Sequence, residues 1–254
     1  MRRPLVAALA AALLAAPAPA YARVPEAPAA PSLTLADSFT LAGSLTAADS
    51  FSLGGVTVNA GADTAQVVTV NRTSGYHAVV TWWVRTSGGW QAMATTSDGR
   101  IGYGGLVKPH KRKQGTGTTP LGTHKLISSF GTHRARAAWA LSYRKIRKGD
   151  YWVQDNGSDY YNRYRNKAAG GFRWWLPSSH ANSSERLKDF PTQYEFAVVT
   201  GFNRGQVRHR GSGIFLHVNG SGATAGCVSV PRSMMVPLMR ELDPAAKPVI
   251  AIGR

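Results

Sequence analysis

Residues 214–230 read Ile-Phe-Leu-His-Val-Asn-Gly-Ser-Gly-Ala-Thr-Ala-Gly-Cys-Val-Ser-Val and contain the single cysteine of the 254-residue chain, Cys227. An apolar run ends at His217, small residues and glycines follow, and a second apolar run meets Pro231. This pattern predicts a strand, a turn that presents the cysteine, and the start of a helix. A helix that began just after Cys227 would place the positive end of its dipole beside a thiolate.

The residue types in this stretch can support nucleophilic catalysis. An imidazole within hydrogen-bond reach can take the proton of a thiol, so His217 and Cys227 are a candidate base and nucleophile. The small residues before the cysteine would leave the backbone N–H groups of Gly226 and Cys227 free to bind an oxyanion. The alternative is that Cys227 is a small buried core residue and His217 a core histidine with its hydrogen bonds made, which is the commoner case for such a pair.

The N-terminus supports a functional role for the cysteine. Residues 1–22 combine a basic start, an apolar Ala- and Leu-rich run and a small-residue cleavage site at Ala20-Tyr21-Ala22. This is the pattern of a secretory signal peptide, and the run is too short for an integral membrane segment. We therefore expect a secreted, cell-wall-associated protein. Its one unpaired cysteine is exposed to oxidation there, which favours a function for the thiol.

Two segments carry a resemblance to a known family. Phe215-Leu216-His217-Val218, followed by Gly222-Ala223-Thr224-Ala225-Gly226-Cys227-Val228, resembles the active-site signature of the L,D-transpeptidase catalytic domain, or YkuD-type, family. Upstream, residues 115–122 read Gly-Thr-Gly-Thr-Thr-Pro-Leu-Gly and are similar to the Thr-Pro-x-Gly segment of that family. The resemblance covers roughly residues 64–254.

The resemblance implies both a fold and a reaction. The fold is mostly β, sandwich-like, with one or two short helices. The reaction is acyl transfer on peptidoglycan stem peptides, in which a thioester on Cys227 passes to an amine and forms a 3-3 cross-link. In that reaction His217 is the base and Gly226 helps to bind the oxyanion. Because this stretch contains no Asp or Glu, we expect a backbone carbonyl to orient the imidazole. The predicted substrate-binding residues are Thr224, Ser229, Tyr161 and Asn162.

Several alternatives remain open. Tyr161 and Asn162 could equally anchor loops through hydrogen bonds. The same thioester could pass to water, which would make the protein an L,D-carboxypeptidase or a wall amidase. Relative to the family pattern, Ala225 replaces a histidine and Ser229 an arginine. These departures suit a third alternative, a non-catalytic cell-wall-binding protein, which a thiol of unshifted or raised pKa would favour.

The chain divides into three parts by composition. After the signal peptide, residues 23–63 are rich in Ala, Ser, Thr, Pro and Gly and contain two near-copies of an octapeptide, at 36–43 and 48–55. Two copies are too few for a solenoid, so we predict a low-complexity spacer. From Gln66, short β-branched runs separated by glycine turns predict the strands of the catalytic domain, residues 64–254.

The charge balance indicates the kind of partner. The chain has 30 Lys and Arg against 13 Asp and Glu, a net charge of +17, and the excess is concentrated between Lys108 and Arg210. A basic surface alone suggests nucleic acid, but export argues against nucleic acid and favours anionic wall polymers as additional partners. The seven histidines lack metal-ligand spacing and no second cysteine is present, so we predict no metal and no cofactor.

Overall fold

The computed structural model describes residues 49–254, so the predicted signal peptide and most of the predicted spacer lie outside the described residues. Within this part of the chain, no helix combines the length and apolar character needed to cross a membrane. The strands are β1 Asp49–Leu53, β2 Val56–Ala60, β3 Gln66–Arg72, β4 His77–Thr86, β5 Gly89–Arg100, β6 Leu106–Val107, β7 Thr119–Pro120, β8 Gly122–Gly131, β9 Tyr143–Lys145, β10 Asp150–Trp152, β11 Tyr164–Asn166, β12 Glu185–Arg186, β13 Phe196–Thr200, β14 Phe215–Val218, β15 Val228–Val230 and β16 Val249–Gly253. The helices are α1 Arg232–Glu241 and the short 3-10 turns η1 Pro109–Lys111, η2 Lys167–Ala169, η3 Leu187–Asp189, η4 Gln193–Glu195 and η5 Pro244–Ala246.

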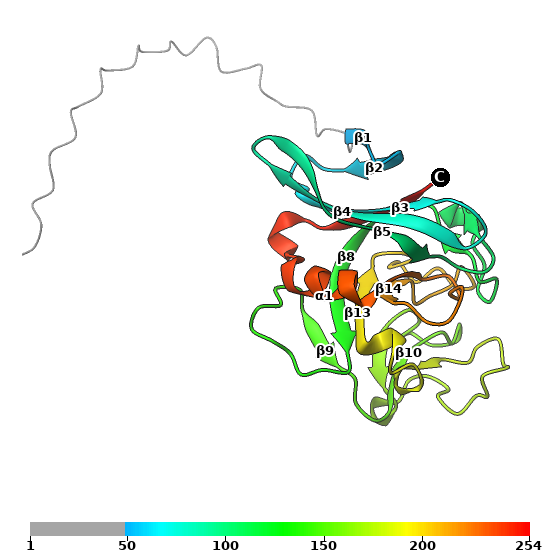
Figure 1. The fold of residues 1–254 in the computed structure, drawn as a ribbon. Coiled ribbons are helices and arrows are strands. Elements are labelled where there is room, and N and C mark those ends of the chain that lie inside the picture. The colour runs from blue at the N-terminus through cyan, green and yellow to red at the C-terminus, as the bar shows by residue number, and fades with distance from the viewer. Residues whose placement is uncertain (1–48) are drawn as a thin grey trace, which may run out of the picture. The chain divides into compact units, whose positions relative to one another are not determined.

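A nine-stranded sheet organises the domain, in the order β13-β14-β15-β5-β4-β3-β16-β8-β9. Strand β8 also pairs with β13, which closes the sheet on itself. In Figure 1, β3, β4 and β5 form one layer, and β8, β13 and β14 lie across from them. This mostly β arrangement, with one α-helix among the described residues, confirms the predicted fold class.

Alternation along the strands separates two hydrophobic clusters. In β14, Leu216 and Val218 point into the interior of the closed sheet, whereas Phe215 points to the opposite face. The same alternation holds in β13, where Val198 joins the interior and Val199 the outer cluster. Because neighbouring side chains of a strand lie on opposite faces, one short strand contributes to both clusters. The outer cluster also contains Cys227, which places the cysteine on the far side of the main core.

Helix α1 fills the interior of the sheet. Its buried residues Met234, Met235, Leu238 and Met239 pack against the interior strands. The helix begins at Arg232, after the three-residue strand β15, and not directly after Cys227. The predicted contribution of its dipole to a thiolate is therefore wrong, because β15 pairs in parallel with β14 and separates the cysteine from the first turn of the helix.

A β-hairpin covers the outer face of the sheet where the sequence analysis placed part of the spacer. Strands β1 and β2 pair in antiparallel register over residues 49–60. Val56 and Val58 pack against Val67 of β3, and the ring of Phe51 stacks on Trp90 at a centroid distance of 5.5 Å. The spacer boundary at residue 63 is corrected accordingly. The apolar residues of the second octapeptide alternate, and this period allows a strand to bury one face.

A second, smaller sheet stands beside the outer cluster. It has three strands in the order β11-β10-β12. Trp152 of β10 packs edge-on against Phe215 of β14, with ring centroids 4.8 Å apart. The small sheet and its connecting loops are thus anchored by an aromatic contact to the strand that carries His217.

Candidate active site

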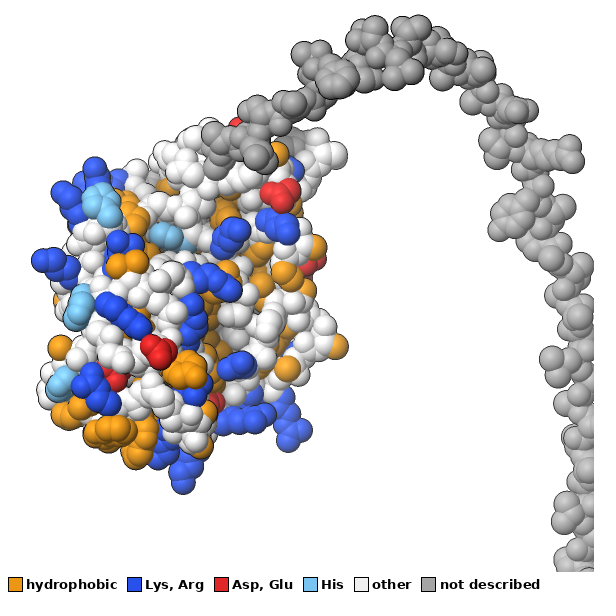
Figure 2. Space-filling model, turned by 180° about the vertical axis from the view of Figure 1, so that it is seen from behind, with side chains coloured by type: hydrophobic (Ala, Val, Ile, Leu, Met, Phe, Trp, Pro, Cys, Tyr) orange, Lys and Arg blue, Asp and Glu red, His pale blue; other side chains and the backbone are white. Residues whose placement is uncertain are grey.

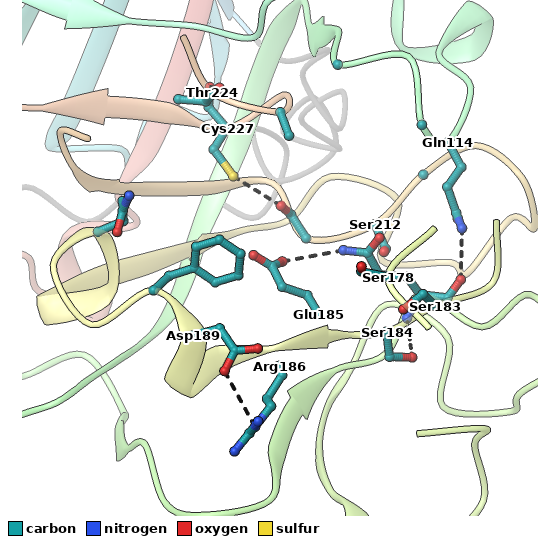
Figure 3. Close-up of a pocket in the computed structure, with 18 of the residues that line it drawn as sticks. Gln114, Ser178, Ser183, Ser184, Glu185, Arg186, Asp189, Ser212, Thr224 and Cys227 are labelled. Carbon is teal, nitrogen blue, oxygen red and sulfur yellow. Dashed lines mark hydrogen bonds and ion pairs between the residues drawn. The ribbon is translucent and has the colours of Figure 1, made fainter. Parts of the chain in front are cut away.

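A cavity of about 820 Å³ opens between the end of β14, the loop before β15 and the segment that contains β12. Figure 3 shows the Cys227 sulfur directed into this cavity from one side and the Glu185 carboxylate directed into it from the other. Its lining includes Arg112, Gln114, Gln154, Glu185, Tyr194, Gly213, His217, Thr224 and Cys227. The predicted nucleophile and base therefore share one cavity.

Cys227 is present as a thiol held by two backbone groups. Its S–H donates to the carbonyl oxygen of Gly213 at 3.2 Å, and its Sγ accepts from the N–H of Phe215 at 3.4 Å. Burial, and to a smaller extent the nearby Glu185 carboxylate, raise the pKa of Cys227 to about 12. The resting nucleophile is consequently uncharged at neutral pH.

His217 is oriented to accept a proton. Its Nδ1 lies 2.8 Å from the carbonyl oxygen of Val218, and because a carbonyl only accepts, Nδ1 carries the hydrogen. Nε2 therefore holds a free lone pair. The predicted orienting group, a backbone carbonyl, is confirmed. Burial lowers the pKa of His217 to about 4, so the imidazole is neutral at physiological pH and able to take a proton.

The base and the nucleophile are not hydrogen-bonded in the resting state. Among the described residues, the hydrogen bonds of Sγ are those to Gly213 and Phe215, and none reaches Nε2 of His217. Catalytic hydrogen bonds are often made only in the substrate complex.

The turn before Cys227 is fixed by Thr224. The N–H of Gly226 donates to Thr224 Oγ1 at 3.1 Å, and the Thr224 hydroxyl donates to the carbonyl oxygen of Cys227 at 2.6 Å. The expectation that the Gly226 N–H is free for an oxyanion is thus corrected. Within the described residues, no acceptor is hydrogen-bonded to the N–H of Cys227, which leaves it as the candidate oxyanion donor.

Glycine is required at position 226 by its backbone and by its neighbours. Its φ is +129°, a conformation that side chains rarely adopt. A Cβ there would lie 2.8 Å from Nη2 of Arg112 and 2.9 Å from the carbonyl oxygen of Thr118. Gly226 therefore shapes the turn, and Thr224 lines the cavity while holding that turn.

Three of the four predicted substrate-binding residues, Ser229, Tyr161 and Asn162, lie outside the cavity lining. Ser229 is fully buried in β15, opposite His217 in the parallel ladder, and its hydroxyl has no hydrogen-bond partner in the described part of the chain. Tyr161 is fully buried as well. Its hydroxyl donates to Gln114 Oε1 at 2.8 Å and accepts from the N–H of Gly211 at 3.0 Å. Their predicted role is corrected to a structural one, because burial removes both side chains from any substrate.

The side chain of Asn162 connects four surrounding groups through hydrogen bonds. Its Oδ1 accepts from Trp152 Nε1 at 2.9 Å and from the N–H of Gly213 at 3.0 Å, and its Nδ2 donates to the carbonyl oxygens of Phe202 and Asn203. It has a φ of +56°, which asparagine tolerates better than most residues. The loop-anchoring alternative is therefore the correct one for Asn162. Through Gly213 it also fixes the carbonyl that holds the Cys227 thiol.

We predict that Asn162→Ala lowers the free energy of unfolding by about 3 kcal/mol, because it leaves several buried groups without partners at about 1–3 kcal/mol each. Urea denaturation at constant pH measures the loss. The control is Asn71→Ala, which removes one exposed hydrogen bond to Gly54 and is expected to cost about 0.5 kcal/mol or less. Equal losses for the two variants would contradict the role assigned to Asn162.

A family model described as the L,D-transpeptidase catalytic domain (YkuD) matches residues 65–250. The chain belongs to this family. A search of curated proteins found no match. Among solved structures, the domain matches one titled "Structure of Bdellovibrio bacteriovorus Bd1075", with 16% sequence identity and a TM-score of 0.36. That match covers 74% of this chain and 48% of the other, so the chain spans about half the length of that protein.

This L,D-transpeptidase domain has two charged residues in its site, Arg112 and Glu185, that no sequence motif predicted. Arg112 is only 5% exposed; it donates through Nε to Thr118 and through Nη1 to Arg210, and burial lowers its pKa. It lies in the basic run Lys108-Pro109-His110-Lys111-Arg112-Lys113, and no local pattern in that run distinguishes the buried arginine from its neighbours. Glu185 sits in a polar segment that showed no periodicity. It becomes part of the site only through the pairing of β12 with β10.

Metal ligands are sparse in the part of the domain that the structure describes. Residues 49–254 contain no group of three or more His, Cys, Asp or Glu side chains placed to hold a metal ion.

Proposed function

We propose that the chain is an acyltransferase that acts on peptidoglycan stem peptides through a thioester on Cys227. The observation that supports this best is the presence, in one cavity, of a thiol and a neutral imidazole whose Nε2 lone pair is free. Membership of the L,D-transpeptidase family makes peptidoglycan the substrate class to test. A secreted, wall-associated location is part of the same proposal.

In the first half-reaction, proton transfer accompanies attack. The raised pKa of the thiol and the lowered pKa of the imidazole both disfavour a resting thiolate–imidazolium pair. Nε2 of His217 takes the proton as Sγ attacks the carbonyl carbon of the third residue of a tetrapeptide. The N–H of Cys227 donates to the oxyanion. The C–N bond to the terminal D-Ala then breaks, and its nitrogen takes the proton from Nε2.

In the second half-reaction, an amine of a neighbouring stem attacks the thioester. Attack forms the amide of a 3-3 cross-link, and Sγ leaves and is reprotonated. If water attacks instead, the product is a free tripeptide, as in an L,D-carboxypeptidase or a wall amidase. Both outcomes share the acyl-enzyme, so they differ only in which nucleophile the cavity admits.

The test is to incubate the protein with a tetrapeptide, with and without a primary amine acceptor, and to follow the products by mass spectrometry. We expect release of D-Ala in both cases and an amide product when the amine is present. Tripeptide alone in the presence of excess amine would favour the hydrolytic alternative. No release of D-Ala by folded, reduced protein would contradict the proposed activity.

One observation favours a second candidate, a non-catalytic wall-binding protein. The pKa of the Cys227 thiol is raised and not lowered, because the side chain is buried beside a carboxylate. Such a thiol is a poor nucleophile unless substrate binding changes its surroundings. Binding of intact peptidoglycan without acylation would be the signature of this candidate.

The surface charge supports a wall location in either case. Lys and Arg side chains are spread across the face shown in Figure 2, where few acidic side chains appear. With a net charge of +17, long-range attraction would concentrate the protein near anionic wall polymers. We expect this attraction to weaken with salt over the range in which the Debye length falls from about 10 to about 3 Å.

A further inference from the structure

Glu185 lies opposite Cys227 in the cavity and has no role in the steps above. It belongs to β12, which pairs with β10 so that Glu185 is opposite Trp152. Its carboxylate is directed into the cavity that Cys227 and His217 line (Figure 3). A carboxylate in a partly closed site loses hydration, and that loss must be offset by hydrogen bonds or by a cation.

The protein supplies hydrogen bonds to this carboxylate but no cation. The Tyr194 hydroxyl donates to Oε1, and Gln154 Nε2 donates to Oε2 at 3.4 Å. Among residues 49–254, no salt bridge includes Glu185. The other acidic residue of the cavity lining, Asp189, pairs with Arg186 at 3.5 Å. Glu185 is thus the one cavity carboxylate in the described chain that lacks a cationic partner.

Tyr194 contacts both the Glu185 carboxylate and the imidazole of His217. Its ring packs edge-on against the ring of His217, with centroids 5.6 Å apart, while its hydroxyl binds Glu185. The titratable groups that face the carboxylate are therefore Tyr194, Cys227 and His217, with Arg112 on the same cavity wall as the thiol. Tyr194 is neutral because burial raises its pKa far above the usual range.

We propose that Glu185 binds the ammonium group of the acceptor stem and takes its proton, which makes the amine the nucleophile that attacks the Cys227 thioester. This inference rests on the proposed acyl transfer. It assigns the acceptor to the class of primary amines that are charged at neutral pH. It also supplies a reason for transfer to compete with hydrolysis, since the carboxylate attracts a cationic amine into the site and offers no such electrostatic attraction to neutral water.

The acceptor amine loses two protons in this step, one to Glu185 and one to the leaving Sγ. The ammonium gives one proton to the Glu185 carboxylate, and the freed lone pair forms the new C–N bond. The C–S bond breaks with its electron pair on Sγ, which receives the second amine proton through His217. Glu185 then releases its proton to solvent. Its pKa, which burial raises to about 7, suits both the uptake and the release of a proton near neutral pH.

The experiment compares wild type with Glu185→Gln, which keeps an acceptor for the Tyr194 hydroxyl. The control is Asp189→Asn, which removes a cavity carboxylate that already has a cation. Each protein is first acylated by a carbapenem and by the tetrapeptide, to show that the thioester forms. Transfer from the tetrapeptide is then measured at pH 7 to Nα-acetyl-lysine, whose amine is charged, and to methoxyamine, which is uncharged.

We expect Glu185→Gln to acylate at least as fast as wild type, because a negative charge beside the thiol is removed. Transfer to Nα-acetyl-lysine should fall by about 10²-fold, the lower end of the range for losing a general base, whereas transfer to methoxyamine should be retained. Asp189→Asn should match wild type with both amines. Unchanged transfer to the lysine amine, or equal losses with both amines, would overturn the proposal. A wild type that forms no thioester would instead overturn the proposed function on which it rests.

Discussion

Replacing Cys227 with alanine is expected to abolish acylation by tetrapeptide and by carbapenem, with a loss on the order of 10⁶-fold, the scale on which removal of a nucleophile acts. The described chain offers no replacement, because Cys227 is its one cysteine. The neighbouring Thr224 hydroxyl is engaged in the turn through its hydrogen bond to the Cys227 carbonyl. Intact-mass spectrometry measures the result directly as the presence or absence of an adduct.

The matched control for this variant is Ser229→Ala, two residues further along. Ser229 is fully buried, is not part of the cavity lining and has a hydroxyl without a partner in the described structure. We expect the control to acylate normally and to be as stable as wild type or more stable, since the change removes an unpaired buried polar group. An adduct on Cys227→Ala, at any residue, would mean that the nucleophile has been assigned incorrectly.

Replacing His217 with glutamine is expected to slow acylation of Cys227 by about 10²- to 10⁴-fold, the range for loss of a general base. Glutamine keeps a polar side chain beside Tyr194 but cannot take the thiol proton. Because burial lowers the pKa of His217 to about 4, the wild-type acylation rate should stay level from neutral pH down to about pH 5 and fall as the pH drops through about 4. Below that pH the imidazole is protonated and cannot accept.

The pH profile separates this base from an ordinary histidine. A solvent-exposed imidazole would lose activity as the pH fell through its usual pKa near 6.5. Stopped-flow or quenched acylation assays between pH 3.5 and 8, with unfolding followed in parallel, provide the profile. The acid limb should be absent from the residual activity of His217→Gln. A limb centred near 6.5 in wild type would show that the imidazole is hydrated and not buried when it reacts.

The reactive pair could be predicted from the sequence because its chemistry is local. His217, Gly226 and Cys227 fall within eleven residues, and the apolar alternation around His217 identifies the strand that carries it. A backbone carbonyl as the orienting group was predictable because no carboxylate lies in that stretch, and the structure identifies it as that of Val218. The main strands from Gln66 onward also followed from β-branched runs between glycine turns.

The remainder of the site depends on contacts between distant segments. Glu185 reaches the cavity through pairing with β10, and Asn162 reaches Gly213 across 51 residues. Tyr161 carries a polar group that sequence reasoning assigned to substrate, but the fold uses it to join Gln114 to Gly211. The hairpin at 49–60 was missed because its composition resembles a linker, and only the strands beneath it make its apolar face useful.

The parallel pairing of β14 with β15 has a consequence for how such a domain can diversify. The register sets His217 opposite Ser229 and thereby fixes the base relative to the residue that precedes β15, Cys227. The backbone hydrogen bonds of this ladder, together with the turn that Thr224 and Gly226 fix, thus set the position of the nucleophile relative to the base, whereas residues 220–223 take no part in it. These residues line the cavity. Substitutions or insertions there would change which substrates fit the site and would leave His217 and Cys227 in place.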